Sequence, residues 1–178
     1  MTISRTAFVA LFLATSSVPV LSQHQHAPAT SPYAGLEKRA LKALSDQQVA
    51  DLKAGHGMGY ALPAELNGYP GPSHGLELKE QLGLTEVQQA RLHELVAAMK
   101  DETIPLGERL IEQEAELDRQ FAQRSVTIAS LSEATAAIGA TQGALRAAHL
   151  KYHLATVEAL TPEQIRKYNH LRGYPGGH

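Results

Sequence analysis

The chain has 178 residues, with 16 Lys and Arg against 18 Asp and Glu and a net charge of -2. This length suits one domain of about 100–150 residues plus additional segments. The small negative charge excludes the strongly basic surface that nucleic-acid binding requires. The absence of cysteine excludes disulfides, thiolate zinc sites, cysteine nucleophiles and lipoprotein attachment.

Residues 1–22 have the pattern of a secretory signal peptide. Arg5 supplies the positive start, residues 7–14 form an apolar run too short to span a membrane, and Val20-Leu21-Ser22 suits cleavage after Ser22. The alternative, a buried N-terminal helix, lacks an amphipathic pattern. No later apolar run reaches about 18 residues, so we expect no membrane span in the mature form. Because the sequence also has no glycosylation sequon, it predicts export to a bacterial periplasm.

Residues 23–32 are predicted to be a disordered tail, and residues 33–75 to form short helices and a Gly/Pro-rich linker. Residues 33–54 favour a pair of short helices. The second of these begins with a Ser45/Gln48 capping box. The first carries one apolar stripe, which consists of Leu36, Ala40, Leu41 and Leu44. The glycines and prolines after this pair predict a loop with at most a short helix at Tyr60–Leu66.

Residues 76–172 are predicted to form one helical domain, followed by a flexible C-terminus at residues 173–178. Gly83 is expected to end a first short helix. Pro105 is expected to break or kink the long helix that follows, near Ile104. No segment shows strand alternation. In chain order, we predict a short helix at 76–82, a long helix from 85, a turn at 122–130, a long helix at about 132–159 and a short helix from 161 to 173.

The helical domain opens and closes with the same motif. Thr85 is followed three residues later by Gln88, and Thr161 by Gln164, which predicts a threonine N-cap and a reciprocal glutamine at each helix start. A leucine precedes each threonine. In the second copy Leu160 and Ile165 also lie at the two positions of a hydrophobic staple, where they are expected to pack together.

These paired Leu-Thr-x-x-Gln motifs, placed behind a signal peptide in a chain without cysteine, resemble the Spy/CpxP family of periplasmic proteins. That family includes the zinc-resistance-associated and CnrX-like metal-sensor branches. The resemblance covers about residues 76–172. It implies an all-α fold in which a long bent antiparallel helical hairpin, with short flanking helices, dimerises into a shallow cradle. It also implies three possible roles for its members: chaperones that need no ATP, regulators of sensor kinases, and metal-binding proteins.

The first functional hypothesis is a chaperone-like protein of envelope stress that holds unfolded or misfolded periplasmic proteins on a homodimeric cradle. A regulator of a sensor kinase is an alternative that the sequence does not separate from it. No nucleophile–base arrangement is visible, so we expect no enzyme. The long helix from 85 also carries an apolar stripe, and the alternative is that the short flanking helices cover it. The residues predicted to contact clients are Leu92, Leu95, Met99, Ile104, Leu106 and Leu110.

The second functional hypothesis is a sensor or buffer of zinc, copper or nickel. His149 and His153 lie one helical turn apart on one face, a spacing at which two imidazoles can share an ion. His93, on the preceding long helix, is the third predicted ligand. The alternative is that His149 packs in the helix interface while His153 is solvated. Further soft or borderline ligands lie on flexible segments, namely His24, His26, His56 with Met58, and His178. No cofactor is otherwise required.

Overall fold

The computed structural model describes residues 31–174 of the chain. The predicted signal peptide, most of the predicted tail and residues 175–178 lie outside this range. The chain divides into two units, residues 1–34 and Gly35–His178. In the first unit only 31–34 are described, and they lie in a turn. Within the described range the second unit is all helical and contains no strand, as predicted.

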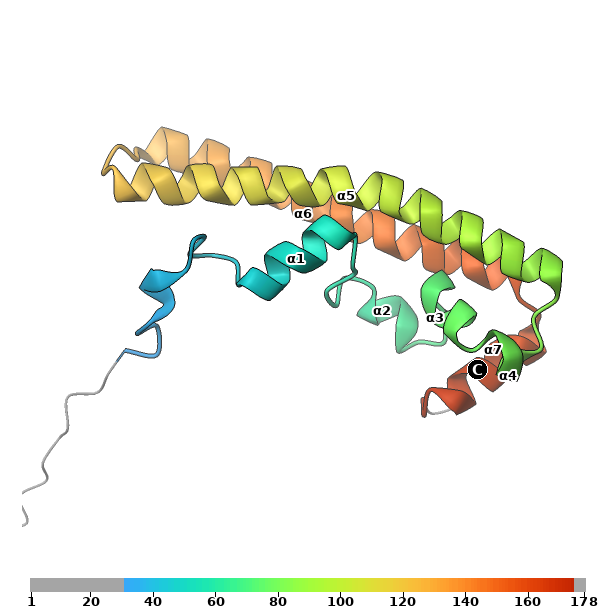
Figure 1. Cartoon of the computed structure of the whole chain (residues 1–178). Coiled ribbons are helices and arrows are strands. Elements are labelled where there is room, and N and C mark those ends of the chain that lie inside the picture. The colour runs from blue at the N-terminus through green and yellow to red at the C-terminus, as the bar shows by residue number, and fades with distance from the viewer. Residues whose placement is uncertain (1–30, 175–178) are drawn as a thin grey trace, which may run out of the picture. The chain divides into compact units, whose positions relative to one another are not determined.

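Two long helices form the frame of the second unit (Figure 1). Helix α5 (Glu86–Ala122) and helix α6 (Ile128–Ala159) pack along each other as a hairpin. The shorter elements flank this hairpin, and α1 and α3 both pack on α5. They are η1 (Leu36–Lys38), α1 (Asp46–Ala54), α2 (Leu62–Glu65), α3 (Pro72–Glu77), α4 (Lys79–Leu82) and α7 (Pro162–Leu171). No described helix is long and apolar enough to cross a membrane.

Reciprocal caps start the helices where the sequence predicts them. Ser45, Thr85 and Thr161 each accept from the backbone N–H three residues later, and the glutamine at that position accepts from the cap. Leu160 and Ile165 pack in the same core cluster, which confirms the predicted staple. Gly83 ends α4 in the left-handed region, with a φ of 63°.

The two glutamines of the motif also bind each other. Gln88 Nε2 donates to Gln164 Oε1 at 2.8 Å, and Gln164 Nε2 donates to Gln88 Oε1 at 3.0 Å. Gln88 Nε2 also lies 3.0 Å from the carbonyl oxygen of Ala159, at the end of α6. The start of α5, the end of α6 and the start of α7 are therefore fastened at one point.

Pro105 was predicted to break or kink the long helix, and it does not break it, because α5 continues through it to Ala122. Figure 1 shows α5 bending near its middle, where Pro105 lies. A proline inside a helix removes one backbone hydrogen bond. Packing of α6 along α5 holds the chain helical despite that loss. The predicted kink is thus present only as a bend.

Three other predicted boundaries need correction. The first helix of the predicted N-terminal pair is only the 3-10 turn η1, although Leu41 and Leu44 are buried as expected. Helix α3 begins at Pro72, inside the predicted loop, because proline suits a first helical position. Helix α6 begins at Ile128 rather than near 132, because Thr127 and Ser130 form a further capping box.

Apolar residues form two core clusters along the hairpin. The basal cluster lies at the fastened end and consists of Leu82, Leu84, Leu92, Leu95, Tyr152, Leu160 and Tyr168. The central cluster joins α1 to the middle of the hairpin and consists of Leu41, Leu44, Leu52, Leu110, Ile138 and Leu145. At Gly107 a Cβ atom would lie 2.6 Å from the carbonyl oxygen of Leu52, so only glycine lets α1 approach α5 this closely.

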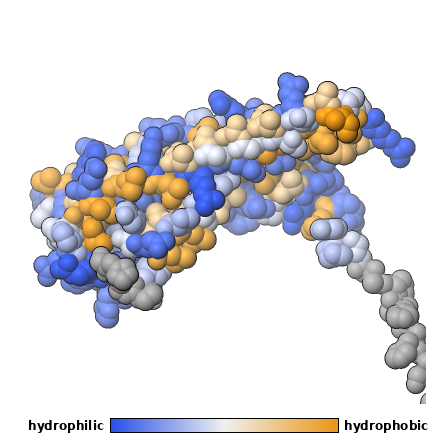
Figure 2. Space-filling view, turned by 180° about the vertical axis from the view of Figure 1, so that it is seen from behind, coloured by the Kyte–Doolittle hydropathy of each residue, from blue (hydrophilic) through white to orange (hydrophobic). Residues whose placement is uncertain are grey.

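The distal half of the hairpin is only partly covered, because Ile111, Ala115 and Leu117 pack against the central cluster and the residues nearer the tip are not part of either cluster. No residue from 111 to 137 is fully buried, although several are half-buried between the two helices. Phe121 and Ile128, on either side of the tip, are 54% and 85% exposed. Figure 2 shows an apolar patch at this end of the hairpin.

Candidate metal site

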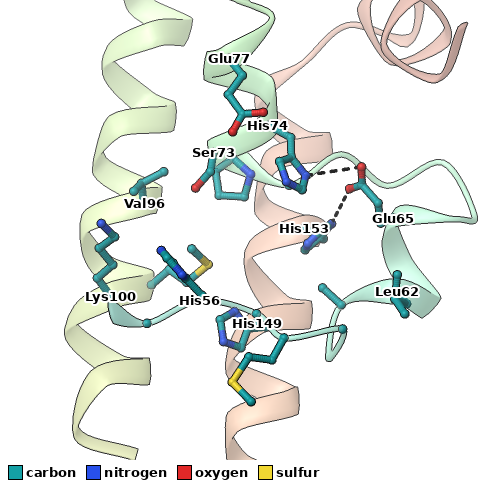
Figure 3. A pocket seen from close by; sticks show the side chains of 18 residues that line it. His56, Leu62, Glu65, Ser73, His74, Glu77, Val96, Lys100, His149 and His153 are labelled. Atoms are coloured by element: carbon teal, nitrogen blue, oxygen red, sulfur yellow. Dashed lines mark ion pairs between the residues drawn. The ribbon is translucent and has the colours of Figure 1, made fainter. Parts of the chain in front are cut away.

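A pocket of about 420 Å³ lies between the hairpin and the segment that precedes α4. Its histidines come from four places in the chain: His56 follows α1, His74 lies in α3, and His149 and His153 lie in α6. Figure 3 shows these four imidazoles around the same hollow. The residues predicted to be a linker therefore fold against the hairpin and supply half of the imidazoles.

His149 is the most enclosed of the four histidines. Its side chain is buried, its ring stacks on Tyr60, and its Nε2 atom has no hydrogen-bond partner. Burial, followed by the nearby His153, lowers the pKa of His149, so the imidazole is neutral near pH 7. A neutral imidazole with an unpaired, buried nitrogen is the form that coordinates a metal ion.

His153 is held in one tautomer. Its Nδ1 atom lies 2.6 Å from the carbonyl oxygen of Tyr69, and a carbonyl can only accept, so Nδ1 carries the proton. In the neutral ring Nε2 is then an acceptor, and a backbone carbonyl on the other nitrogen is the usual support of a metal-binding histidine. A Cβ atom at Gly71 would lie 2.9 Å from the ring, so the loop contacts His153 closely.

Glu65 connects the pocket to the C-terminal helix. Its buried carboxylate accepts hydrogen bonds from the hydroxyls of Tyr168 and Tyr174. Nδ1 of His74 lies 3.5 Å from one oxygen, and Nδ1 of His153 lies 3.8 Å from the other (Figure 3). Burial alone would raise the pKa of Glu65, but the interactions with His74 and Tyr168 outweigh it and lower the pKa to about 2. Glu65 is therefore a permanent negative charge beside the histidines.

The predicted metal ligands are only partly brought together. His149 and His153 line the pocket and are 3% and 6% exposed, so the expectation of a solvated His153 is wrong. His93 is exposed on α5 and does not line the pocket. In the described part of the chain, no three His, Asp or Glu side chains are arranged to share one ion.

The residues predicted to contact clients lie against the chain's own core. Leu92 and Leu95 belong to the basal cluster and Leu110 to the central cluster. Met99, Ile104 and Leu106 are half-buried. Between Leu92 and Leu110 the chain's own flanking segments cover the apolar stripe of α5, as the alternative to client binding expects.

Sequence reasoning did not place Glu65, His74 or Met99 in the site. Each lies alone in its local pattern: Glu65 and His74 reach the pocket only because residues 55–77 fold onto the hairpin, and Met99 reaches it from α5. The Gly/Pro-rich stretch was the available signal, because such loops carry binding residues when a rigid frame positions them.

Comparison with known proteins identifies the family. A model described as LTXXQ motif family protein matches residues 73–172, more than half of the chain. No curated protein and no solved structure matches the chain. The matched range runs from α3 to the end of α7 and contains both fastened glutamines. The chain therefore belongs to the LTXXQ motif family, a family of periplasmic proteins of the Spy/CpxP type.

Proposed function

We propose that this protein is a periplasmic metal-responsive sensor or buffer that binds zinc, copper or nickel through His149 and His153. The observation that supports this proposal best is the buried, unpartnered Nε2 of His149 in a pocket lined by three other histidines. A buried polar atom without a partner costs free energy. A metal ion bound to Nε2 would remove that cost.

The surrounding charges favour a cation. Glu65 and Glu77 line the pocket with one lysine, Lys100. Imidazole nitrogens are suitable ligands for zinc, copper and nickel. The protein would hold the ion without catalysing a reaction, and occupancy would tie the segment before α4 to the hairpin.

The test is calorimetric titration of the protein with Zn(II), Cu(II) and Ni(II). We expect the His149→Gln/His153→Gln variant to lose at least about tenfold in affinity, as metal sites commonly do when their ligands or supports change. The matched control is His93→Gln/His170→Gln, which removes two exposed histidines. A further variant, His24→Ala/His26→Ala/His178→Ala, measures binding by the other histidines.

Thermal unfolding gives a second measurement. A ligand that binds only the folded state raises the melting temperature with its concentration. Circular dichroism of the metal-free variants establishes that they fold. Equal affinities for wild type and for the His149/His153 variant would refute the proposal.

A second candidate function is a chaperone-like holdase of envelope stress, acting as a homodimer. The supporting observation is the sparsely buried tip of the hairpin with exposed Phe121 and Ile128. Such surface suits weak contacts with unfolded chains or with a second copy. Contact with a sensor kinase would use the same surface.

The holdase is tested by the aggregation of a reduced client protein at near-equal concentration. We expect wild type to suppress aggregation and Phe121→Ser/Ile128→Ser to lose this effect. Val87→Ser is the matched control, because Val87 is 80% exposed at the other end of α5. No protection by wild type would refute this function. Sedimentation with and without metal would determine whether the protein is a dimer.

A further inference from the structure

Both methionines that follow the initiator line the histidine pocket. The chain has three methionines, and the two after Met1 are Met58 and Met99. Met58 comes from the glycine-rich loop after α1, and Met99 comes from α5. Both lie among the residues around His149 and His153. With no cysteine in the chain, these two thioethers are its only soft ligands beyond the first residue.

The backbone holds Met58 in a conformation that disfavours methionine. Its φ is 43°, in the left-handed region, and it lies between Gly57 and Gly59. Glycine adopts this conformation without the steric cost that a side chain brings. Within the described residues only Arg124 is another non-glycine residue with positive φ. Strain of this kind points to a function for the side chain that it places.

The nitrogen and oxygen donors of the pocket do not complete a site by themselves. No three of the described His, Asp and Glu side chains can share one ion. A further protein ligand would therefore be of another type, and the two thioethers line the same pocket. Thioether sulfur selects Cu(I), whereas zinc and nickel are served well by imidazole.

We propose that the pocket is a Cu(I) site in which Met58 and Met99 join His149 and His153. This inference rests on the proposed metal-binding function and specifies its ion. The site would use one ligand from the loop after α1, one from α5 and two from α6. Packing is the competing role for the methionines, since Met58 borders the central cluster and Met99 the basal cluster.

The test compares Cu(I) with Zn(II) in wild type and in Met58→Leu/Met99→Leu. Cu(I) is supplied anaerobically in competition with a chromophoric Cu(I) chelator, and Zn(II) is titrated by calorimetry. Leucine has nearly the volume of methionine, so packing is conserved and the metal-free melting temperature should stay close to that of wild type. We expect Cu(I) affinity to fall by at least about tenfold, with little change in Zn(II) affinity.

X-ray absorption at the copper edge provides a reading that packing alone would not change. Sulfur neighbours are expected in the Cu(I)-loaded wild type and should be absent in the leucine variant. If Cu(I) binding needs His149 but the leucine variant keeps full affinity and wild type shows no sulfur, the thioether site is wrong while metal binding stands. If wild type binds neither of these ions and binds neither Cu(II) nor Ni(II) in the titrations above, the proposed function itself fails.

Discussion

Gln88 and Gln164 hold each other through two reciprocal amide hydrogen bonds while each also accepts from the backbone N–H of its own N-cap threonine. One oxygen on each side chain thus serves both the local cap and the contact between helices. Neither helix start is capped independently of the other. The two copies of the motif form one structural unit although they lie at opposite ends of the hairpin's sequence.

The glutamine pair should show a large coupling free energy. We expect Gln88→Ala to lower the free energy of unfolding by about 2 kcal/mol, because it removes bonds to the cap, to Gln164 and to Ala159. Gln48→Ala is the control, since Gln48 completes a capping box alone, and should cost about 1 kcal/mol or less. In a double-mutant cycle measured by urea unfolding, Gln88→Ala and Gln164→Ala should be non-additive. Additive losses would contradict the pairing.

Alanine at Gly107 should weaken the contact between α1 and α5. The new Cβ would lie 2.6 Å from a backbone oxygen of Leu52, which cannot move aside as a side-chain end can. We expect a loss of about 1–3 kcal/mol in urea unfolding. Gly139→Ala is the matched control, because nothing lies within 4 Å of its Cβ position in α6. It should stabilise the protein by about 0.5–1 kcal/mol through helix propensity. Equal effects of both changes would exclude a close helix contact at Gly107.

Replacing Pro105 should stabilise the protein. Pro105 is exposed within a continuous helix, so Pro105→Ala restores a backbone donor and removes a steric conflict. The greater entropy of the unfolded chain offsets part of this gain. We expect a net increase of about 1 kcal/mol or more, measured as a rise in melting temperature. A lower melting temperature would show that α6 packs only against a bent α5.

The metal-free protein should lose stability in acid through Glu65. Its pKa is lowered from 4.5 to about 2, so its carboxylate stabilises the fold above pH 4.5. That contribution is lost as the pH falls from 4.5 toward 2. Glu65→Gln should cost about 1–3 kcal/mol near pH 7 and show a flatter pH dependence of unfolding over this interval. Glu80→Gln, which removes an exposed carboxylate in α4, should retain the wild-type slope. A wild-type slope in Glu65→Gln would contradict the assignment.

Local signals in the sequence were sufficient to predict most helix starts. A Thr or Ser followed by Gln at the third position needs only the adjacent residues to form its bonds, and all three predicted boxes are present. The box at Thr127 was missed because Ser130 takes the place of the glutamine. Pro105 does not break α5, because packing along α6 outweighs the local cost of proline.

The pocket could be predicted only in part. The spacing of His149 and His153 follows from helix geometry, and both do line it. Glu65 and His74 reach them only because Gly71 lets the loop pass against the ring of His153. No periodicity in the sequence encodes such a long-range contact. Likewise, His93 has suitable chemistry but points away, because α5 uses its other face for packing.

The absence of fully buried side chains between residues 111 and 137 has a consequence for how the hairpin opens. Its fastened end is held by the glutamine pair and the basal cluster, whereas its tip is held by a single helix contact. Amide hydrogens should therefore exchange fastest at the tip and more slowly toward the fastened end. The free energy of local opening should rise along α5 from Ala122 back toward Glu86. The two long helices would separate from the tip inward, while the residues around the histidine pocket stay folded.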